Sequence, residues 1–204
     1  MIVSPTIVCL SVALFVAASG WIQAQATRPA DIQKSCRNFV QGFYLWYVPK
    51  NLTSHDGPAF TLALKEKESV FSPELFRMLQ QDSDAQAKAS EIVGLDFDPF
   101  LNSQDPEESY VVGTINVRGD RYFVDIHGKS SGRTSAKPAV VAELILRDGR
   151  WLFVNFHYGV TKYQEDENLL SVLKTLRANR QKSGHALLRQ SGVVRNAPFA
   201  AIAD

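Results

Sequence analysis

The sequence is short of cysteine, which excludes one common way of stabilising a small domain. Cys9 and Cys36 are the only cysteines among 204 residues, and Cys9 lies in an amino-terminal apolar run. If that run is removed, one thiol remains and no internal disulfide can form. Cys36 recurs at helical spacing with Phe39, Val40 and Phe43, so we expect a small buried hydrophobe rather than a reactive thiol.

Several catalytic and cofactor motifs are also missing. The sequence has no phosphate-cradling glycine loop, no Cys-x-x-Cys pair and no His-Glu-x-x-His, so no cofactor is predicted. The formal net charge is only +1, which argues against nucleic acid as a partner. The charged residues between 174 and 195 are nevertheless all lysine or arginine. This carboxyl-terminal segment could contact anionic lipid or an acidic partner instead of facing solvent.

Positive charge is missing ahead of the amino-terminal apolar run, where an export signal usually carries it. Residues 7–18 are nearly all apolar and are followed by Ala24-Gln25-Ala26, a small-x-small cleavage pattern. We therefore predict a signal peptide over residues 1–26, cleaved after Ala26, and a periplasmic or secreted protein. The apolar run is shorter than the roughly 20 residues that span a bilayer, so no membrane segment is expected after cleavage.

The sequence does contain four short runs, between residues 110 and 158, in which apolar residues occupy alternate positions. Arg-Gly-Asp-Arg at 118–121 separates the first two runs, and Asp148-Gly149 separates the last two. A glycine-bearing turn between alternating runs predicts an antiparallel hairpin, most strongly where the turn is Asp-Gly. Four strands joined by such short connections form an antiparallel sheet.

Helical patterns flank the predicted sheet. Residues 31–48 and 59–67 have helical spacing, Ser72-Pro73-Glu74 has the cap, proline and acid of a helix start, and residues 169–176 form a closing helix. We predict one α+β domain over residues 27–182, with N-terminal helices packed on a curved four-stranded antiparallel sheet and a closing C-terminal helix. Residues 183–204 are expected to be a loosely ordered tail.

The first predicted helix is rich in aromatic residues. Phe43, Trp46 and Tyr47 cluster on it and could line a ligand cavity. Core packing is the commoner use of such a stripe, so both interpretations stay open.

An acidic connector, residues 91–108, lies between the helices and the sheet. Asp96, Asp98 and Asp105, with Asn102 and Gln104, supply the oxygen ligands that calcium prefers. The glycine and the glutamate of a helix-loop-helix calcium site are missing from the corresponding positions. Because aspartate and asparagine also form turns with their own backbone, a structured connector is favoured over a metal site.

The candidate catalytic residues lie on the predicted strands. Asp125 and His127 share one parity of the second strand, and Asn155 and His157 share one parity of the fourth. If these residues converge in a pocket, Asp125 could orient an imidazole for proton transfer. Alternatively they face water, since one side of an antiparallel sheet is often solvated.

A charged pair is expected on the third predicted strand. Glu143 and Arg147 lie on the opposite parity to the apolar Ala142 and Leu144. We therefore expect these two side chains to pair with each other at the surface.

The connector and the segments after it resemble a known family. Asp96-x-Asp98-Pro99 is followed by Gln104-Asp105, alternating strands, Gly149-Arg150-Trp151 and a Leu-Leu helix. This order is similar to that of a family of small exported bacterial proteins known as domain of unknown function 3828, over most of the chain after residue 26. The resemblance implies a nuclear-transport-factor-two-like or cystatin-like α+β fold. It implies no established activity, so no catalytic residue is carried over.

Two hypotheses for the function follow. The first is a non-enzymatic exported binding protein that uses the cavity between sheet and helices, or its rim, to hold a small molecule or an envelope protein, such as the partner in an inhibitor or immunity pair. The second is a small hydrolase, isomerase or dehydratase that uses His127 or His157 as the base and Asp125 as its orienter. The first is favoured because the sequence contains no convincing catalytic set, and the oligomeric state is not predicted.

Overall fold

The computed structural model describes residues 28–53, 57–159 and 167–192, with side chains described up to residue 183. The helices are α1 (Pro29–Thr53), α2 (Ala59–Glu66), η1 (Glu68–Val70, a 3₁₀ turn), α3 (Pro73–Ala87) and α4 (Leu169–Gly192). The strands are β1 (Ser109–Arg118), β2 (Arg121–Ser130), β3 (Arg133–Thr134), β4 (Val140–Arg147) and β5 (Arg150–Tyr158). The predicted signal peptide, residues 1–26, lies outside the described residues.

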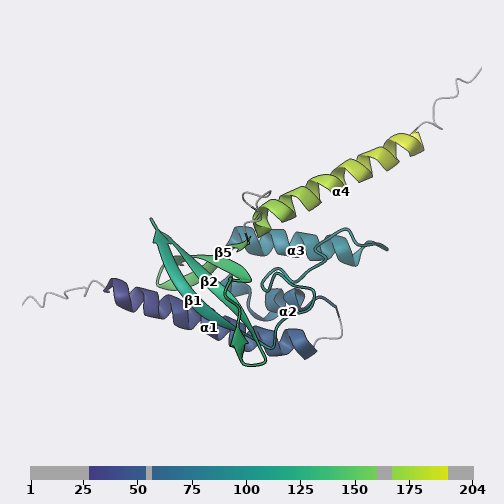
Figure 1. Ribbon diagram of the computed structural model, residues 1–204. Helices are drawn as coiled ribbons and strands as arrows, with labels where there is room; N and C mark the ends of the chain where they lie inside the picture. The colour runs from purple at the N-terminus through teal and green to yellow at the C-terminus, as the bar shows by residue number, and fades with distance from the viewer. Residues whose placement is uncertain (1–27, 54–56, 160–166, 193–204) are drawn as a thin grey trace, which may run out of the picture.

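The sheet is antiparallel, with the order β1-β2-β4-β5, and α1 lies across one of its faces (Figure 1). The predicted α+β class is confirmed. The predicted strand count was one too low, because β3 pairs with the end of β2 through Lys129–Thr134 and Ser130–Arg133. Ser131 and Gly132, with φ of 49° and 75°, make this pairing possible by turning the chain sharply.

The Asp-Gly hairpin is confirmed. Asp148 and Gly149 join β4 to β5 and both have positive φ, as a type I′ turn requires. The start of α3 is confirmed as well. The Ser72 hydroxyl accepts a hydrogen bond from the Leu75 amide at 3.3 Å, and Pro73 occupies the first turn.

Two helices extend further than their sequences indicate. Helix α1 continues through Pro49 to Thr53, whereas we expected it to end before the proline. Side-chain bonds stabilise this last turn, from the Thr53 hydroxyl to the Pro49 carbonyl at 2.9 Å and from Asn51 to Asp98 at 2.6 Å. Helix α4 runs to Gly192, into the segment expected to be a loose tail. No described helix is both long and apolar enough to cross a membrane.

The core between α1 and the sheet is filled by aromatic rings. Phe43 is 5% exposed and lies 5.0 Å from Phe153 and 5.5 Å from Phe100, measured between ring centroids. Each buried aromatic removes about 150–250 Å² of surface from water, so these contacts dominate the packing. The buried Cys36 lies in the same core, as expected.

A β-bulge in β5 determines which of its residues face α1. Glu143 pairs with Asn155 and the next residue of β4 pairs with Phe153, so Val154 has no partner on β4. One extra residue reverses the alternation of side chains beyond it. Trp151 and Phe153 therefore face the core, while Asn155 lies on the opposite face although its number has the same parity.

Candidate functional site

The four candidate catalytic residues lie on the outer face of the sheet, which we define as the face turned away from α1. The strand register places Asp125 opposite Val141, and Val141 opposite His157. His127 lies two residues further along β2, on the same face. Their backbones are therefore neighbours, as the first condition of the catalytic hypothesis requires.

The expected pairing between Asp125 and a histidine does not form in the described part of the chain. The Nδ1 atom of His127 lies 2.9 Å from the Ser135 carbonyl oxygen, and its ring covers Gly113, where a Cβ atom would lie 2.6 Å from Nε2. The carboxylate that bonds a strand histidine is Glu143, whose Oε2 atom lies 2.7 Å from Nε2 of His157. The prediction that Asp125 orients the imidazole is therefore corrected.

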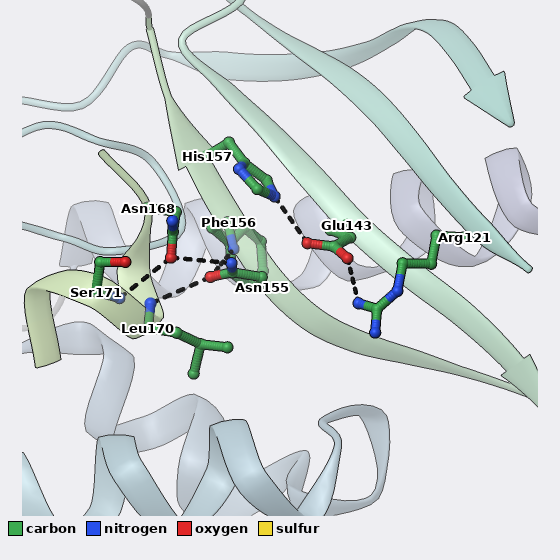
Figure 2. A network of polar contacts seen from close by, with 8 residues as sticks. All are labelled: Arg121, Glu143, Asn155, Phe156, His157, Asn168, Leu170 and Ser171. Carbon is green, nitrogen blue, oxygen red and sulfur yellow. Dashed lines mark hydrogen bonds and ion pairs between the residues drawn. The ribbon is translucent and has the colours of Figure 1, made fainter. Parts of the chain in front are cut away.

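Glu143 is the centre of the polar network on the outer face (Figure 2). It is only 6% exposed and binds the guanidinium of Arg121 as well as His157, so the expected pair with Arg147 is replaced by partners on β2 and β5. Burial alone would raise the pKa of Glu143, but the hydrogen bonds and charges of His157 and Arg121 hold it below its usual value.

Asn155 connects β5 to α4 through hydrogen bonds, which Figure 2 shows beside the Glu143 network. Its Oδ1 atom accepts from the Leu170 amide at 3.1 Å, and its Nδ2 group donates to Asn168 at 3.0 Å. Asn168 in turn caps α4 by accepting from the Ser171 amide at 3.1 Å. Asn155 thus ties the bulge of β5 to the start of α4, and both of its functional groups are used in doing so.

A serine motif that sequence reasoning missed lies nearby. Residues 128–132 read Gly-Lys-Ser-Ser-Gly, the spacing of a nucleophile elbow. An elbow is a strand-to-helix turn, whereas Ser130 is the last residue of β2 and is followed by the turn into β3. Its hydroxyl donates to the Glu107 carboxylate rather than to a histidine. The motif therefore lacks the structural context of a catalytic serine.

The candidate ligand-binding aromatics belong to the packed core between α1 and the sheet or lie against it, so they do not form the expected cavity there. Phe43 and Tyr47 are buried in the core, with their rings stacked 5.4 Å apart. Trp46 is half-buried and lies between Lys50 and Lys67, whose ammonium groups are 5.3 and 5.0 Å from the ring centroid. The geometry matches the core-packing interpretation.

Asp98 organises the acidic connector. Its Oδ1 atom accepts from the Phe100 and Leu101 amides at 2.9 and 3.0 Å, and its Oδ2 atom accepts from the Tyr47 hydroxyl and from Asn51. Burial raises the pKa of Asp98 to about 6, although these hydrogen bonds act in the opposite direction. Both oxygens are occupied by protein donors, as a structured connector requires.

The metal hypothesis gains no support from the connector's geometry. Asp96 and Asp105 are exposed, and the described residues contain no group of three or more His, Cys, Asp or Glu side chains arranged to hold a metal ion. The carboxylate of Asp98 is already saturated with hydrogen bonds.

A pocket of about 700 Å³ opens beside Asp98, and we call it the connector pocket. It forms where the ends of α1 and α3 and the start of α2 meet the connector. The described residues that line it are Asn51, Pro58, Ala59, Phe60, Gln86, Ile92, Leu95, Asp96, Phe97, Asp98, Ser103, Gln104 and Pro106. The volume lies within the range of about 300–1,000 Å³ that is typical of small-molecule sites.

The rim of this pocket is held by side chains of α3. The Asp82 carboxylate accepts from the Leu95 amide at 2.8 Å, and Gln86 accepts from the Val93 and Gly94 amides at 2.9 Å each. A side chain at Gly94 would collide with Asp82, because a Cβ atom there would lie 2.8 Å from Oδ2. These contacts make the pocket a built feature of the fold rather than a gap between loops.

No family model matches the sequence, and no curated protein matches it. Among solved structures, a protein of unknown function from Bacteroides thetaiotaomicron aligns at 18% identity and a TM-score of 0.45, over 62% of this chain and 92% of that chain. A chain of the type VI effector–immunity complex Tae3–Tai3 from Ralstonia pickettii aligns at 21% identity and a TM-score of 0.42, over 60% and 93% respectively. Similarities at this level carry no conclusion about function.

Proposed function

We propose that this protein is a non-enzymatic binding protein that holds a small molecule in the connector pocket. The observation that carries the proposal is the pocket itself, whose lining is mainly apolar and contains a few polar groups fixed by hydrogen bonds. A cavity of this kind with a residue of perturbed pKa is the usual form of a ligand site.

The composition of the lining supports binding rather than catalysis. The described lining residues include no histidine, cysteine or lysine, and the carboxylate of Asp98 is engaged by protein donors. The histidines of the alternative hypothesis, His127 and His157, lie on the outer face of the sheet, away from this lining.

The proposal includes export and the family resemblance. Export is supported by the apolar run and the cleavage pattern of residues 1–26. The family resemblance is supported by the order of the motifs after residue 26. Fractionation of host cells, with determination of the mature amino terminus, tests export. A chain that begins after Ala26 in the periplasmic or culture fraction is expected, and an intact chain in the cytoplasmic fraction would contradict export.

Native mass spectrometry of the protein purified from its own host tests the binding function. We expect an extra mass of a few hundred daltons that is lost on unfolding. Ile92→Ser should lower occupancy because it removes an apolar lining side chain that is 74% exposed and could be covered by a ligand. Leu45→Ser is the matched control, since Leu45 is 68% exposed on α1 and lies outside the pocket. A bare mass, or equal occupancy in both variants, would contradict the proposal.

A second candidate function is binding of a protein partner through the outer face. The observation that favours it is a set of half-buried apolar residues, Phe123, Val141 and Ile145, beside the Glu143 network. Apolar residues surrounded by polar ones are common at protein interfaces. Here native mass spectrometry should show a stoichiometric second protein that is lost in Phe123→Ser and retained in Ile92→Ser.

A further inference from the structure

Among the described residues that line the connector pocket, the charges have one sign. Asp96 and Asp98 are the charged residues in the described lining, which contains no lysine, arginine or histidine. The acidic connector from which most of the lining comes holds six acids and no base along its length: Glu91, Asp96, Asp98, Asp105, Glu107 and Glu108. A concave site lined by one sign of charge concentrates ligands of the opposite sign.

The helix ends around the pocket add to this field. Asn51 belongs to the last turn of α1 and Gln86 to the last turn of α3, and helix carboxyl ends carry partial negative charge. The start of α2, at Pro58 to Phe60, contributes the opposite sign. Two carboxyl ends against one amino end leave a net preference for positive charge.

Asp96 is the acid that can reach a ligand. The carboxylate of Asp98 is occupied by four donors, and those of Glu107 and Glu108 accept from Ser130 and Ser131. Asp96 lines the pocket, and its carboxylate makes no hydrogen bond or ion pair with any described residue. Its backbone is held in place, since its carbonyl accepts from Gln104 at 2.9 Å.

The rest of the lining sets the character of the ligand's body. Phe60, Leu95 and Phe97 give apolar surface inside the pocket, and the exposed Ile92 stands at its mouth. Phe97 is fixed by an edge-on contact with Tyr158 at 5.3 Å between ring centroids. These side chains would contact a hydrocarbon or aromatic group and not a strongly hydrated ion.

We infer that the ligand of the connector pocket is an organic cation, a protonated amine on an apolar or aromatic body, with Asp96 as the counter-ion. This inference rests on the proposed function and specifies the chemical class of its ligand. The acids, the net effect of the three helix ends and the apolar lining favour such a molecule together.

Three probes of similar size and different charge test the inference: 2-phenylethylamine, 2-phenylethanol and 3-phenylpropanoate. Each is titrated into isotopically labelled protein at low salt, and amide shifts of the pocket residues are followed by nuclear magnetic resonance. We expect the amine to shift the signals of Ile92, Leu95 and Phe97, the alcohol to bind about threefold to fivefold more weakly, and the carboxylate not to bind. Raising the salt concentration should weaken the binding of the amine and leave the binding of the alcohol unchanged.

Two variants test whether Asp96 is the carboxylate that binds the amine. Asp96→Asn should reduce the affinity for the amine about threefold to fivefold, the usual cost of losing an ion pair with a solvent-exposed carboxylate, and leave the affinity for the alcohol unchanged. Asp105→Asn is the matched control, because it removes an acid of the same connector that does not line the pocket. Thermal unfolding of both variants confirms that the fold is intact. Equal losses in the two variants would overturn the role of Asp96.

The outcomes separate this inference from the proposed function. If the alcohol or the carboxylate binds the pocket as well as the amine, or if the ligand that co-purifies with the protein is neutral or anionic, the cation class is wrong and the binding function stands. If no probe shifts a pocket signal and the protein carries no ligand from its host, both are wrong.

Discussion

Asp98 in the acidic connector and Glu143 on the outer face are carboxylates that each organise several donors, but their pKa values move in opposite directions. Asp98 is held by neutral groups, the hydroxyl of Tyr47, the amide of Asn51 and two backbone amides, and burial raises its pKa to about 6. Glu143 is held by Arg121 and His157, and its pKa is lowered despite its burial. The comparison indicates that a network containing the Arg121 guanidinium can outweigh the burial of Glu143, whereas the neutral donors around Asp98 do not outweigh its burial.

The largest effect is expected from Asp98→Ala. Four donors would lose their acceptor, so the free energy of unfolding should fall by about 3–4 kcal/mol in a urea titration. Asp96→Ala, an exposed acid two residues earlier, is the control and should change it by less than about 0.5 kcal/mol. A loss below about 1 kcal/mol for Asp98→Ala would mean that the connector does not depend on this carboxylate.

The pH dependence of stability separates the two carboxylates. The pKa of Asp98 rises from 3.8 to about 6 on folding, so its neutral form stabilises the fold below pH 4 and that stability is lost as the pH rises through 6. This shift corresponds to at most about 3 kcal/mol. Urea titrations between pH 4 and 7 should show the decline in the wild type relative to Asp98→Asn. Identical pH profiles for the two proteins would contradict the raised pKa.

For Glu143, the pH dependence of stability should have the opposite sign to that of Asp98 and should appear at lower pH, and Glu143→Gln tests this. Because folding lowers the pKa of Glu143, its ionised form contributes stability above its unfolded value near 4.5, and this contribution disappears as the pH falls. At neutral pH we expect a loss of about 1–2 kcal/mol, since a hydrogen-bonded charge is removed. The measurement is the same titration extended to pH 3. A variant as stable as the wild type at pH 7 would show that the network is dispensable.

Arg121→Ala should have the smallest effect, about 0.5 kcal/mol, because half of this side chain is in solvent. Salt should reduce the effect further.

Tyr47→Phe removes an uncharged donor from Asp98 and is the counterpart of Arg121→Ala. We expect a loss of about 1 kcal/mol in the free energy of unfolding, and this loss should not depend on salt. Unfolding at low and at high salt checks both. A salt-independent loss in Arg121→Ala would mean that packing, not charge, is the contribution of the arginine.

Local features of the sequence were predicted well. The hairpin at Asp148-Gly149, the helix start at Ser72 and the aromatic face of α1 depend on a few neighbouring residues, and the structure contains all three. The end of α1 was wrong because contacts from a distant segment, through Asn51 and Asp98, stabilise the turn after Pro49.

The candidate site was predicted less well. Strand parity alone placed Asn155 with Phe153, whereas the bulge at Val154 separates them onto different faces. The partners of Glu143 lie 22 residues before it and 14 residues after it, so no local pattern could identify them. The sequence showed the charge of the connector, as a run of acids without a base, but no pattern indicated the pocket beside it.

The sequence by itself determined the α+β class, the hairpins, the helix starts and the acidic connector, because backbone preference, periodicity and charge are properties of short segments. Only the tertiary structure decided which face Asn155 and His157 occupy, which donors reach Asp98 and Glu143, and where a pocket opens. The physical reason is that a bulge, a hydrogen-bond network and a cavity each require groups from segments far apart in the chain to meet at distances of a few ångströms.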